Sequence, residues 1–152
     1  MSVHSLRVQR TARFCVLGDL DGDWSEVWYA LHGYGQLAGR FLAEFEPLAS
    51  PGRLWVAPEG LSRFYLREGA GRVGASWMTR EERGAEIEDQ LAWLDALHAH
   101  VVGRRGRAPA RVGVLGFSQG AATAARWTAL GSALTAKLAR LVLWGGALPP
   151  DL

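Results

Sequence analysis

The residues best suited to chemistry in this sequence are a serine and two glycines, spaced as Gly116-x-Ser118-x-Gly120. A serine between two glycines fits a turn too sharp for larger neighbours, and such a turn holds the hydroxyl group clear of the backbone. A hydroxyl group presented in this way is a candidate nucleophile for attack on a carbonyl carbon. Because the chain contains 19 glycines in 152 residues, the spacing also arises by chance, and a glycine-rich turn with an incidental serine is the alternative.

The segments on either side of the serine are those that this chemistry requires. Residues 112–117 form a short apolar run with β-branched members, which is typical of a strand buried on both faces. The small residues after Gly120 favour a helix. A helix that begins at the serine directs its free N–H groups and the positive end of its dipole toward a developing oxyanion. This context favours Ser118 as a nucleophile.

A second glycine-rich turn, with the sequence His-Gly-Tyr-Gly at 32–35, follows a strand expected at Val27–Leu31. Its backbone N–H groups are candidates to bind the same oxyanion. Two alternatives stay open. The pattern Gly-x-Gly-x-x-Ala that ends at Ala38 also matches a variant of the dinucleotide-binding fingerprint, with Glu59 near the position of a ribose-binding acid. A glycine turn without a ligand is the third interpretation.

Strand and helix patterns alternate along the rest of the chain. The other segments with a pattern are one or two outer strands in Arg7–Leu17, a helix at Leu37–Glu46, a strand at Leu54–Ala57, an irregular stretch at Leu61–Ala75, a helix from a capping box at Thr79–Glu82 to Gly103, and a strand at Ala139–Trp144. The alternation predicts an α/β fold with a mostly parallel sheet, helices on both faces and a single domain over residues 1–152.

Composition narrows the functional classes. The chain is 49% hydrophobic with a net charge of +2, which indicates a globular protein, and the basic cluster at 103–107 is predicted to be a solvated loop rather than a nucleic-acid site. Cys15 is the single cysteine, and no apolar run is long enough for a membrane span, so a cytoplasmic protein is expected. His98 and His100 are expected to have a polar-rim or end-of-helix role, and no metal is expected.

Three stretches together resemble one family. The serine turn, the turn at 32–35 and the sequence Ser-Trp-Met at 76–78 resemble, in that relative placement, the phospholipase/carboxylesterase family of α/β-hydrolases, which includes the acyl-protein thioesterases. The resemblance implies a serine esterase that cleaves small-molecule carboxylic esters or thioesters through an acyl-enzyme, without a cofactor. It also implies roles for five residues: Ser118 as nucleophile, the backbone N–H groups of Tyr34 and Gln119 as the oxyanion hole, and Trp77 and Met78 as the lining of the acyl channel.

The sequence departs from this family after the serine. In the α/β-hydrolase order an acid and then a histidine follow the nucleophile, but Asp151 is the only acid after Ser118, and no histidine follows it. We therefore expect this chain to be the N-terminal two-thirds or so of the domain, nearly inactive alone and prone to self-association along Ala139–Trp144. A non-catalytic binding module with the same fold, and a dinucleotide-binding oxidoreductase, are the alternative functions.

Overall fold

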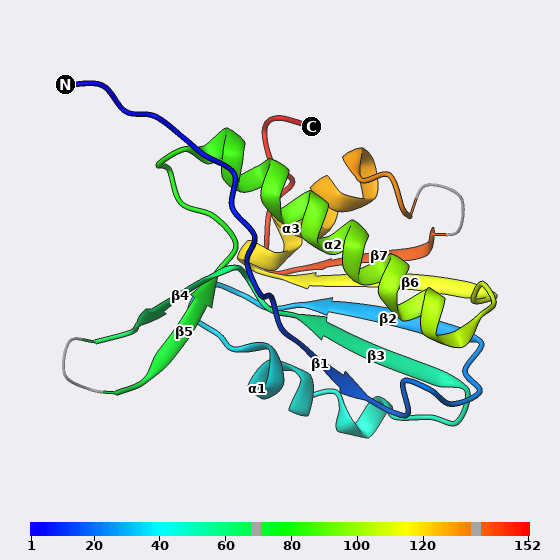
Figure 1. Cartoon of the computed structure of the whole chain (residues 1–152). Helices are drawn as coiled ribbons and strands as arrows, with labels where there is room; N and C mark the ends of the chain where they lie inside the picture. Colours follow the sequence, from blue (N-terminus) through cyan, green and yellow to red (C-terminus); the bar gives the residue numbers. More distant parts are fainter. Residues whose placement is uncertain (68–70, 135–137) are drawn as a thin grey trace.

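A computed structural model describes residues 1–67, 71–134 and 138–152 of the chain. Its main sheet has five strands in the order β1-β3-β2-β6-β7 (Figure 1). These strands are β1 (Phe14–Leu17), β2 (Glu26–Leu31), β3 (Arg53–Pro58), β6 (Arg111–Phe117) and β7 (Leu138–Trp144). β1 is antiparallel to β3, whereas the pairings of β2 with β3, of β2 with β6 and of β6 with β7 are parallel. The predicted mostly parallel sheet is confirmed.

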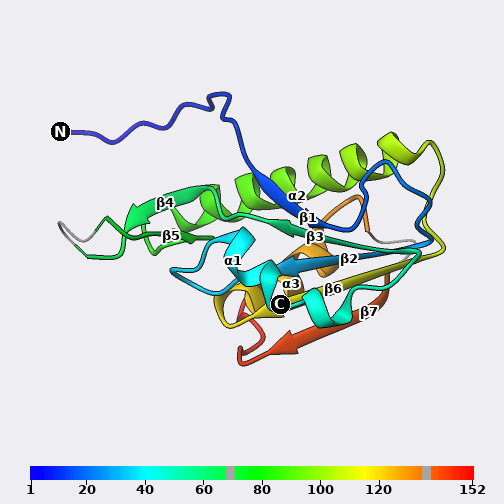
Figure 2. The ribbon, with the colours of Figure 1, turned by 90° about the horizontal axis from the view of Figure 1, so that it is seen from below.

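Helices pack on both faces of this sheet, as the alternating pattern predicted (Figure 2). They are α1 (Ala38–Ala43), the short 3₁₀ helix η1 (Glu46–Leu48), α2 (Arg83–Arg105) and α3 (Gln119–Leu130). One core cluster joins α2 and α3 to the sheet around Tyr29 and Trp127, and the other joins α1 to the opposite face around Phe41 and Trp55. Strands buried on both faces are apolar throughout, which explains why β2 and β6 were readable from sequence.

The parallel register of β2 and β6 sets the position of the two glycine-rich turns. Leu31, the last residue of β2, lies opposite Gly116, near the end of β6. Because the strands are parallel, the turn at 32–35 and the serine turn leave the sheet at the same edge. Open parallel sheets bind their ligands beyond the carboxyl ends of the strands, so this edge is where a site is expected.

A β-hairpin occupies much of the stretch that the sequence predicted to be irregular. β4 (Ser62–Tyr65) and β5 (Val73–Ser76) form a separate antiparallel pair, and residues 68–70 lie outside the described part of the chain. The hairpin is tied to the turn at 33–36, which follows β2, because Gly35 N–H donates to Ala75 O at 2.9 Å and Ala75 N–H donates to Gln36 O at 3.0 Å. Its two strands pair without an alternating apolar pattern, so the prediction of an irregular stretch was wrong.

The capping box did not mark the start of the long helix. α2 begins at Arg83, after Glu82, whose φ of 48° is left-handed, and no side chain caps the helix. Thr79 N–H instead donates to the carboxylate of Glu86. The helix also continues past Gly103 and is followed by Gly106, whose φ of 72° suits a glycine cap. An isolated glycine inside a helix is tolerated at a modest cost, which makes Gly103 a poor end signal.

The ends of two other predicted elements also differ. The first strand is limited to β1, and Arg7 lies in an extended segment where its guanidinium contacts Glu88 at 2.6 Å. The predicted helix Leu37–Glu46 is divided into α1 and η1.

The basic cluster at 103–107 is mostly the last turn of α2 rather than a loop, and Arg104 pairs with Asp21 at 2.7 Å. This ion pair neutralises part of the cluster.

Candidate active site

Ser118 occupies the corner between β6 and α3 in a conformation that residues other than glycine rarely adopt. Its φ is 52° and its ψ is −115°, and its side chain is exposed. Ser118 N–H donates to Trp144 O at 2.9 Å, and Ser118 O accepts from Ala121 N–H at 3.0 Å. These two bonds anchor the backbone on both sides of the side chain. Such a residue carries about 1–3 kcal/mol of strain, which the surrounding packing must sustain.

The neighbouring glycines are required by close contacts with the backbone. A Cβ atom at Gly116 would overlap the carbonyl oxygen of Gly120, and a Cβ atom at Gly120 would overlap the carbonyl oxygen of Leu31. A Cβ atom at Gly146 would lie 2.6 Å from Ser118 O, closer than real Cβ contacts. The chain thus approaches itself closely on both sides of the serine. No side chain in the described residues hydrogen-bonds the Ser118 hydroxyl group.

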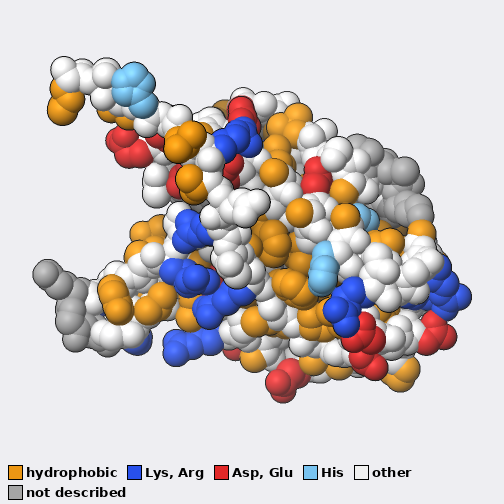
Figure 3. All heavy atoms as spheres, viewed as in Figure 1, with side chains coloured by type: hydrophobic (Ala, Val, Ile, Leu, Met, Phe, Trp, Pro, Cys, Tyr) orange, Lys and Arg blue, Asp and Glu red, His pale blue; other side chains and the backbone are white. Residues whose placement is uncertain are grey.

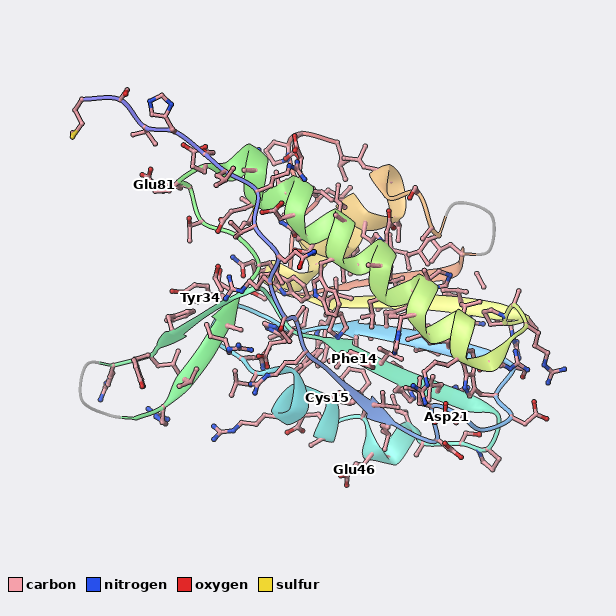
Figure 4. The ribbon with its side chains drawn as sticks, viewed as in Figure 1. Phe14, Cys15, Asp21, Tyr34, Glu46 and Glu81 are labelled. Atoms are coloured by element: carbon pink, nitrogen blue, oxygen red, sulfur yellow. The ribbon has the colours of Figure 1, made fainter. Side chains whose placement is uncertain are left out.

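The turn at 33–36 leaves one backbone N–H group available. Gly33 N–H donates to the side-chain oxygen of Gln36 at 2.7 Å, Gly35 N–H donates to Ala75 O, and Gln36 N–H donates to Gly33 O at 3.2 Å. In the described part of the chain, the N–H of Tyr34 has no such acceptor. The Tyr34 side chain is exposed beside the β4–β5 hairpin (Figure 4). The first N–H of α3, that of Gln119, lacks a partner inside its helix, as first-turn groups do.

Direct contacts place this turn against the serine corner. A Cβ atom at Gly33 would lie 3.0 Å from the ring of Phe117, the residue before the serine. A Cβ atom at Gly120 would lie 2.5 Å from the carbonyl oxygen of His32. The two turns that the sequence singled out therefore pack against each other at one edge of the sheet. The hydroxyl of Ser118 and the N–H of Tyr34 belong to adjoining segments.

The side chain of Gln119 ties the serine corner to the Ser-Trp-Met stretch, a link that the sequence did not predict. Its Oε1 accepts from Trp77 N–H at 3.0 Å, and its Nε2 donates to Met78 O at 2.9 Å. Trp77 itself is 3% exposed and packs in the core cluster, where its indole N–H donates to His32 O at 2.7 Å. Met78 lines a cavity of about 460 Å³ together with Gln119.

His32 has both ring nitrogens engaged. Gly60 N–H donates to Nε2 at 3.0 Å, which leaves the proton on Nδ1, and Nδ1 donates to Gly33 O at 2.8 Å. The ring stacks on Trp77 with centroids 4.9 Å apart. Burial lowers the pKa of His32, although the bond to Gly33 O opposes this effect. His32 therefore holds the glycine turn in place as a neutral ring.

The other histidines also lie away from the serine. His98 is 8% exposed, lies inside α2 and hydrogen-bonds the hydroxyl of Tyr29 at 2.8 Å, so the prediction of a polar-rim or end-of-helix role was wrong for this residue. The ring of His100 is exposed against Phe14, and His4 lies in the exposed N-terminal segment. Within the described ranges, no three His, Cys, Asp or Glu side chains are grouped closely enough to hold a metal ion.

Glu59, the residue that a dinucleotide site would use, is already engaged. Its carboxylate is 2% exposed and accepts from Arg13 at 2.6 Å, from Arg63 at 3.3 Å and from Ala38 N–H at 3.1 Å. Burial raises the pKa of Glu59, but the hydrogen bonds from Arg13 and Ala38 outweigh it and hold the pKa below its usual value. Because its carboxylate is already bound by these partners, a ribose-binding role for Glu59 is disfavoured. Basic side chains gather between the N-terminal segment and the hairpin in Figure 3.

Comparisons with known proteins identify the fold. No family model and no curated protein matches the chain. Among solved structures, esterase PE8 shares 24% identity and a TM-score of 0.65 over 91% of this chain and 66% of its own. A phospholipase/carboxylesterase from Dyadobacter fermentans shares 16% identity and a TM-score of 0.66 over 93% and 63%. Acyl-protein thioesterase 2 from Zea mays shares 28% identity and a TM-score of 0.57 over 92% and 64%.

The chain has the fold of the carboxylesterase-like α/β-hydrolases, as the resemblance implied. It spans slightly less than two thirds of the length of these three structures. Throughout the described residues, every helix is too short or too polar to cross a bilayer.

Proposed function

We propose that this protein is a serine hydrolase of carboxylic esters or thioesters, with Ser118 as the nucleophile. The observation that carries the proposal is the conformation of Ser118, exposed and left-handed at the carboxyl end of a central parallel strand. A strained residue that the packing sustains at a ligand-binding edge of a sheet is typical of a functional group. The hydroxyl oxygen attacks the carbonyl carbon, its proton passes to the departing alkoxide or thiolate, which leaves as the alcohol or thiol, and water later cleaves the acyl-enzyme to the carboxylic acid and free Ser118.

We assign the oxyanion hole to the N–H groups of Tyr34 and Gln119. Both lack an acceptor in the described part of the chain, and their segments adjoin the serine corner. Two fixed donors at a developing negative charge are worth far more in a preorganised site than in water. The dipole of α3, a helix of 12 residues, adds to their effect. No metal or cofactor enters this scheme.

The supporting residues have separate roles in the proposal. Met78, on the wall of the cavity, contacts the acyl chain. Trp77 acts from the core, because its indole N–H fixes the carbonyl of His32 and so the turn that carries Tyr34. Trp77 is thus a positioning residue rather than a contact surface for the acyl chain.

Proton transfer sets the rate of this chain when it is isolated. The contacts of His32 and His98 hold both rings away from the Ser118 hydroxyl group. A serine without a base is a weak nucleophile, and the oxyanion hole with binding alone gives a rate ~10³-fold above that in water. We therefore propose slow turnover by residues 1–152. These same contacts favour the second candidate, a non-catalytic binding module with the hydrolase fold.

Intact-mass spectrometry separates the two candidates. The purified chain is incubated with p-nitrophenyl butyrate, and the adduct is located by peptide mapping. The proposal predicts a butyryl group on Ser118, because a site without a base also deacylates slowly. Ser118→Ala is the matched control and should lose the adduct. A chain with no adduct on Ser118, while the folded state is intact, would support the non-catalytic module.

A further inference from the structure

The cavity beside the serine corner is lined by several positively charged side chains. Three arginines, Arg80, Arg83 and Arg126, line it, and its lining within the described residues contains no aspartate or glutamate. Gln119, the neighbour of the proposed nucleophile, belongs to the same wall. The rest of the lining includes Met78 and small or apolar residues. The cavity therefore joins an apolar surface to a concentration of positive charge.

Two of these arginines already hold a carboxylate. Arg126 binds Asp151 with two parallel bonds of 2.8 Å, from Nε to Oδ2 and from Nη2 to Oδ1, and Arg83 Nη2 contacts the same Oδ1 at 2.6 Å. The side chain of Arg126 is 4% exposed, whereas those of Arg83 and Asp151 are 40% and 31% exposed. Paired N–H donors in this geometry match a carboxylate group. The guanidinium groups hold the pKa of Asp151 well below its usual range.

The positive charges that line the cavity outnumber the one carboxylate in the described residues that contacts them, that of Asp151. Asp151 neutralises one of the three arginines, so the cavity keeps an excess positive charge that a bound anion would reduce. Arg126 also lies 3.5 Å from the sulfur of Met78, which connects the charged end of the cavity to the proposed acyl contact. From Gln119 to Arg126 the helix rises about 10 Å. An extended chain of several carbon atoms covers such a distance.

We propose that Arg83 and Arg126 form an anion subsite, so that the preferred esters carry a carboxylate on the part of the molecule that lies in this cavity. The inference rests on the proposed hydrolase function and names its substrate class. The substrate carboxylate takes the place of, or shares the guanidinium groups with, the carboxylate of Asp151. Fixed positive groups raise both the affinity and the selectivity for such a ligand over its neutral analogue.

The test measures binding, so that it does not depend on the serine chemistry. Monomethyl suberate, which carries one carboxylate, and dimethyl suberate, which carries none, are titrated into the Ser118→Ala chain by isothermal calorimetry. We expect the monomethyl ester to bind about tenfold more tightly, the effect of one charged hydrogen-bonded contact. Equal affinities for the two esters would overturn the subsite, whereas failure of the proposed function would show in the Ser118 adduct alone.

Two variants with opposite expected effects separate recognition from structure. Arg83→Gln should lower the affinity for monomethyl suberate about tenfold and leave the affinity for dimethyl suberate unchanged. Asp151→Asn should raise the affinity for monomethyl suberate several-fold, because it removes the competing carboxylate and leaves Arg126 and Arg83 free to bind the ligand. Arg40→Gln, an exposed arginine on α1, is the matched control. Weaker binding in Asp151→Asn, or an equal loss in Arg40→Gln, would contradict the proposal.

Discussion

At the scale of single residues, the strained backbone of Ser118 determines how substitutions at this position change the free energy of unfolding. A side chain at φ 52° is held against its own preference, whereas glycine adopts this conformation freely. Ser118→Gly should therefore be more stable than Ser118→Ala by about 1 kcal/mol, although glycine loses more entropy on folding. Urea unfolding followed by circular dichroism gives the difference. Equal stabilities would mean that the corner is unstrained.

The buried ring of His32 predicts how stability changes with pH. Burial lowers the pKa of His32 in the folded chain, so below pH 6.5 the unfolded state takes up a proton that the folded state refuses. The free energy of unfolding should therefore fall as the pH drops from 7 toward 5, by up to about 1.4 kcal/mol per pH unit. Carboxylates such as Glu59, whose pKa is lowered, act at more acidic pH.

Histidine variants separate this effect from other titrations. His32→Gln, which keeps a hydrogen-bond acceptor, should be less stable at pH 7 but should lose the fall between pH 7 and 5. His100→Gln removes an exposed histidine and should keep the fall. Urea titrations at the two pH values measure both variants. A fall that persists unchanged in His32→Gln would assign it to another group.

At the scale of the elements, two glycines in helices should respond in opposite ways to the same substitution. Gly120→Ala places a methyl group on the carbonyl oxygen of Leu31 and should cost at least about 3 kcal/mol, because the strand and helix must separate. Gly103→Ala, inside α2 with open space around it, should stabilise the chain by about 0.5–1 kcal/mol. Thermal unfolding measures both. A loss of stability in Gly120→Ala well below this value would contradict the prediction, because the backbone near Leu31 could then move to make room for the methyl group.

These elements also show what the sequence could predict. The strand, corner and helix around Ser118 were readable because their determinants are local, an apolar run and glycines at contact positions. The hairpin β4–β5 was missed because its strands have no alternating apolar pattern, and the backbone bonds that hold Ala75 come from Gly35 and Gln36, which lie far away in the sequence. The bonds from Arg126 to Asp151 were missed for the same reason. Long-range polar contacts leave no periodic signal.

At the scale of the whole molecule, β7 is an edge strand with apolar side chains in solvent. Leu141 and Val142 are each 38% exposed and Trp144 is 60% exposed, so both sides of the strand are open. An edge of this kind offers unpaired backbone groups to another strand. We expect the isolated chain to self-associate through β7 at micromolar concentrations, and Val142→Lys to shift it toward the monomer. Sedimentation velocity measures the distribution.

A matched variant locates this association. Leu6→Lys changes an equally apolar and more exposed side chain in the N-terminal segment, at 87% exposure, and should leave the distribution as it is. A wild-type chain that stays monomeric over the concentration range, or a Val142→Lys chain that associates like the wild type, would contradict an interface at β7.

The most direct test of the central claim compares Ser118 with the other serines of the same chain. A fluorophosphonate probe phosphonylates hydroxyl groups with loss of fluoride, and peptide mapping over time gives the labelling rate of each serine. The proposal assigns the N–H groups of Tyr34 and Gln119 to the charge that develops on the probe, so we expect Ser118 to react at least about tenfold faster than exposed Ser132 or Ser25. Rates that follow exposure alone, with Ser118 no faster than these two, would contradict the account.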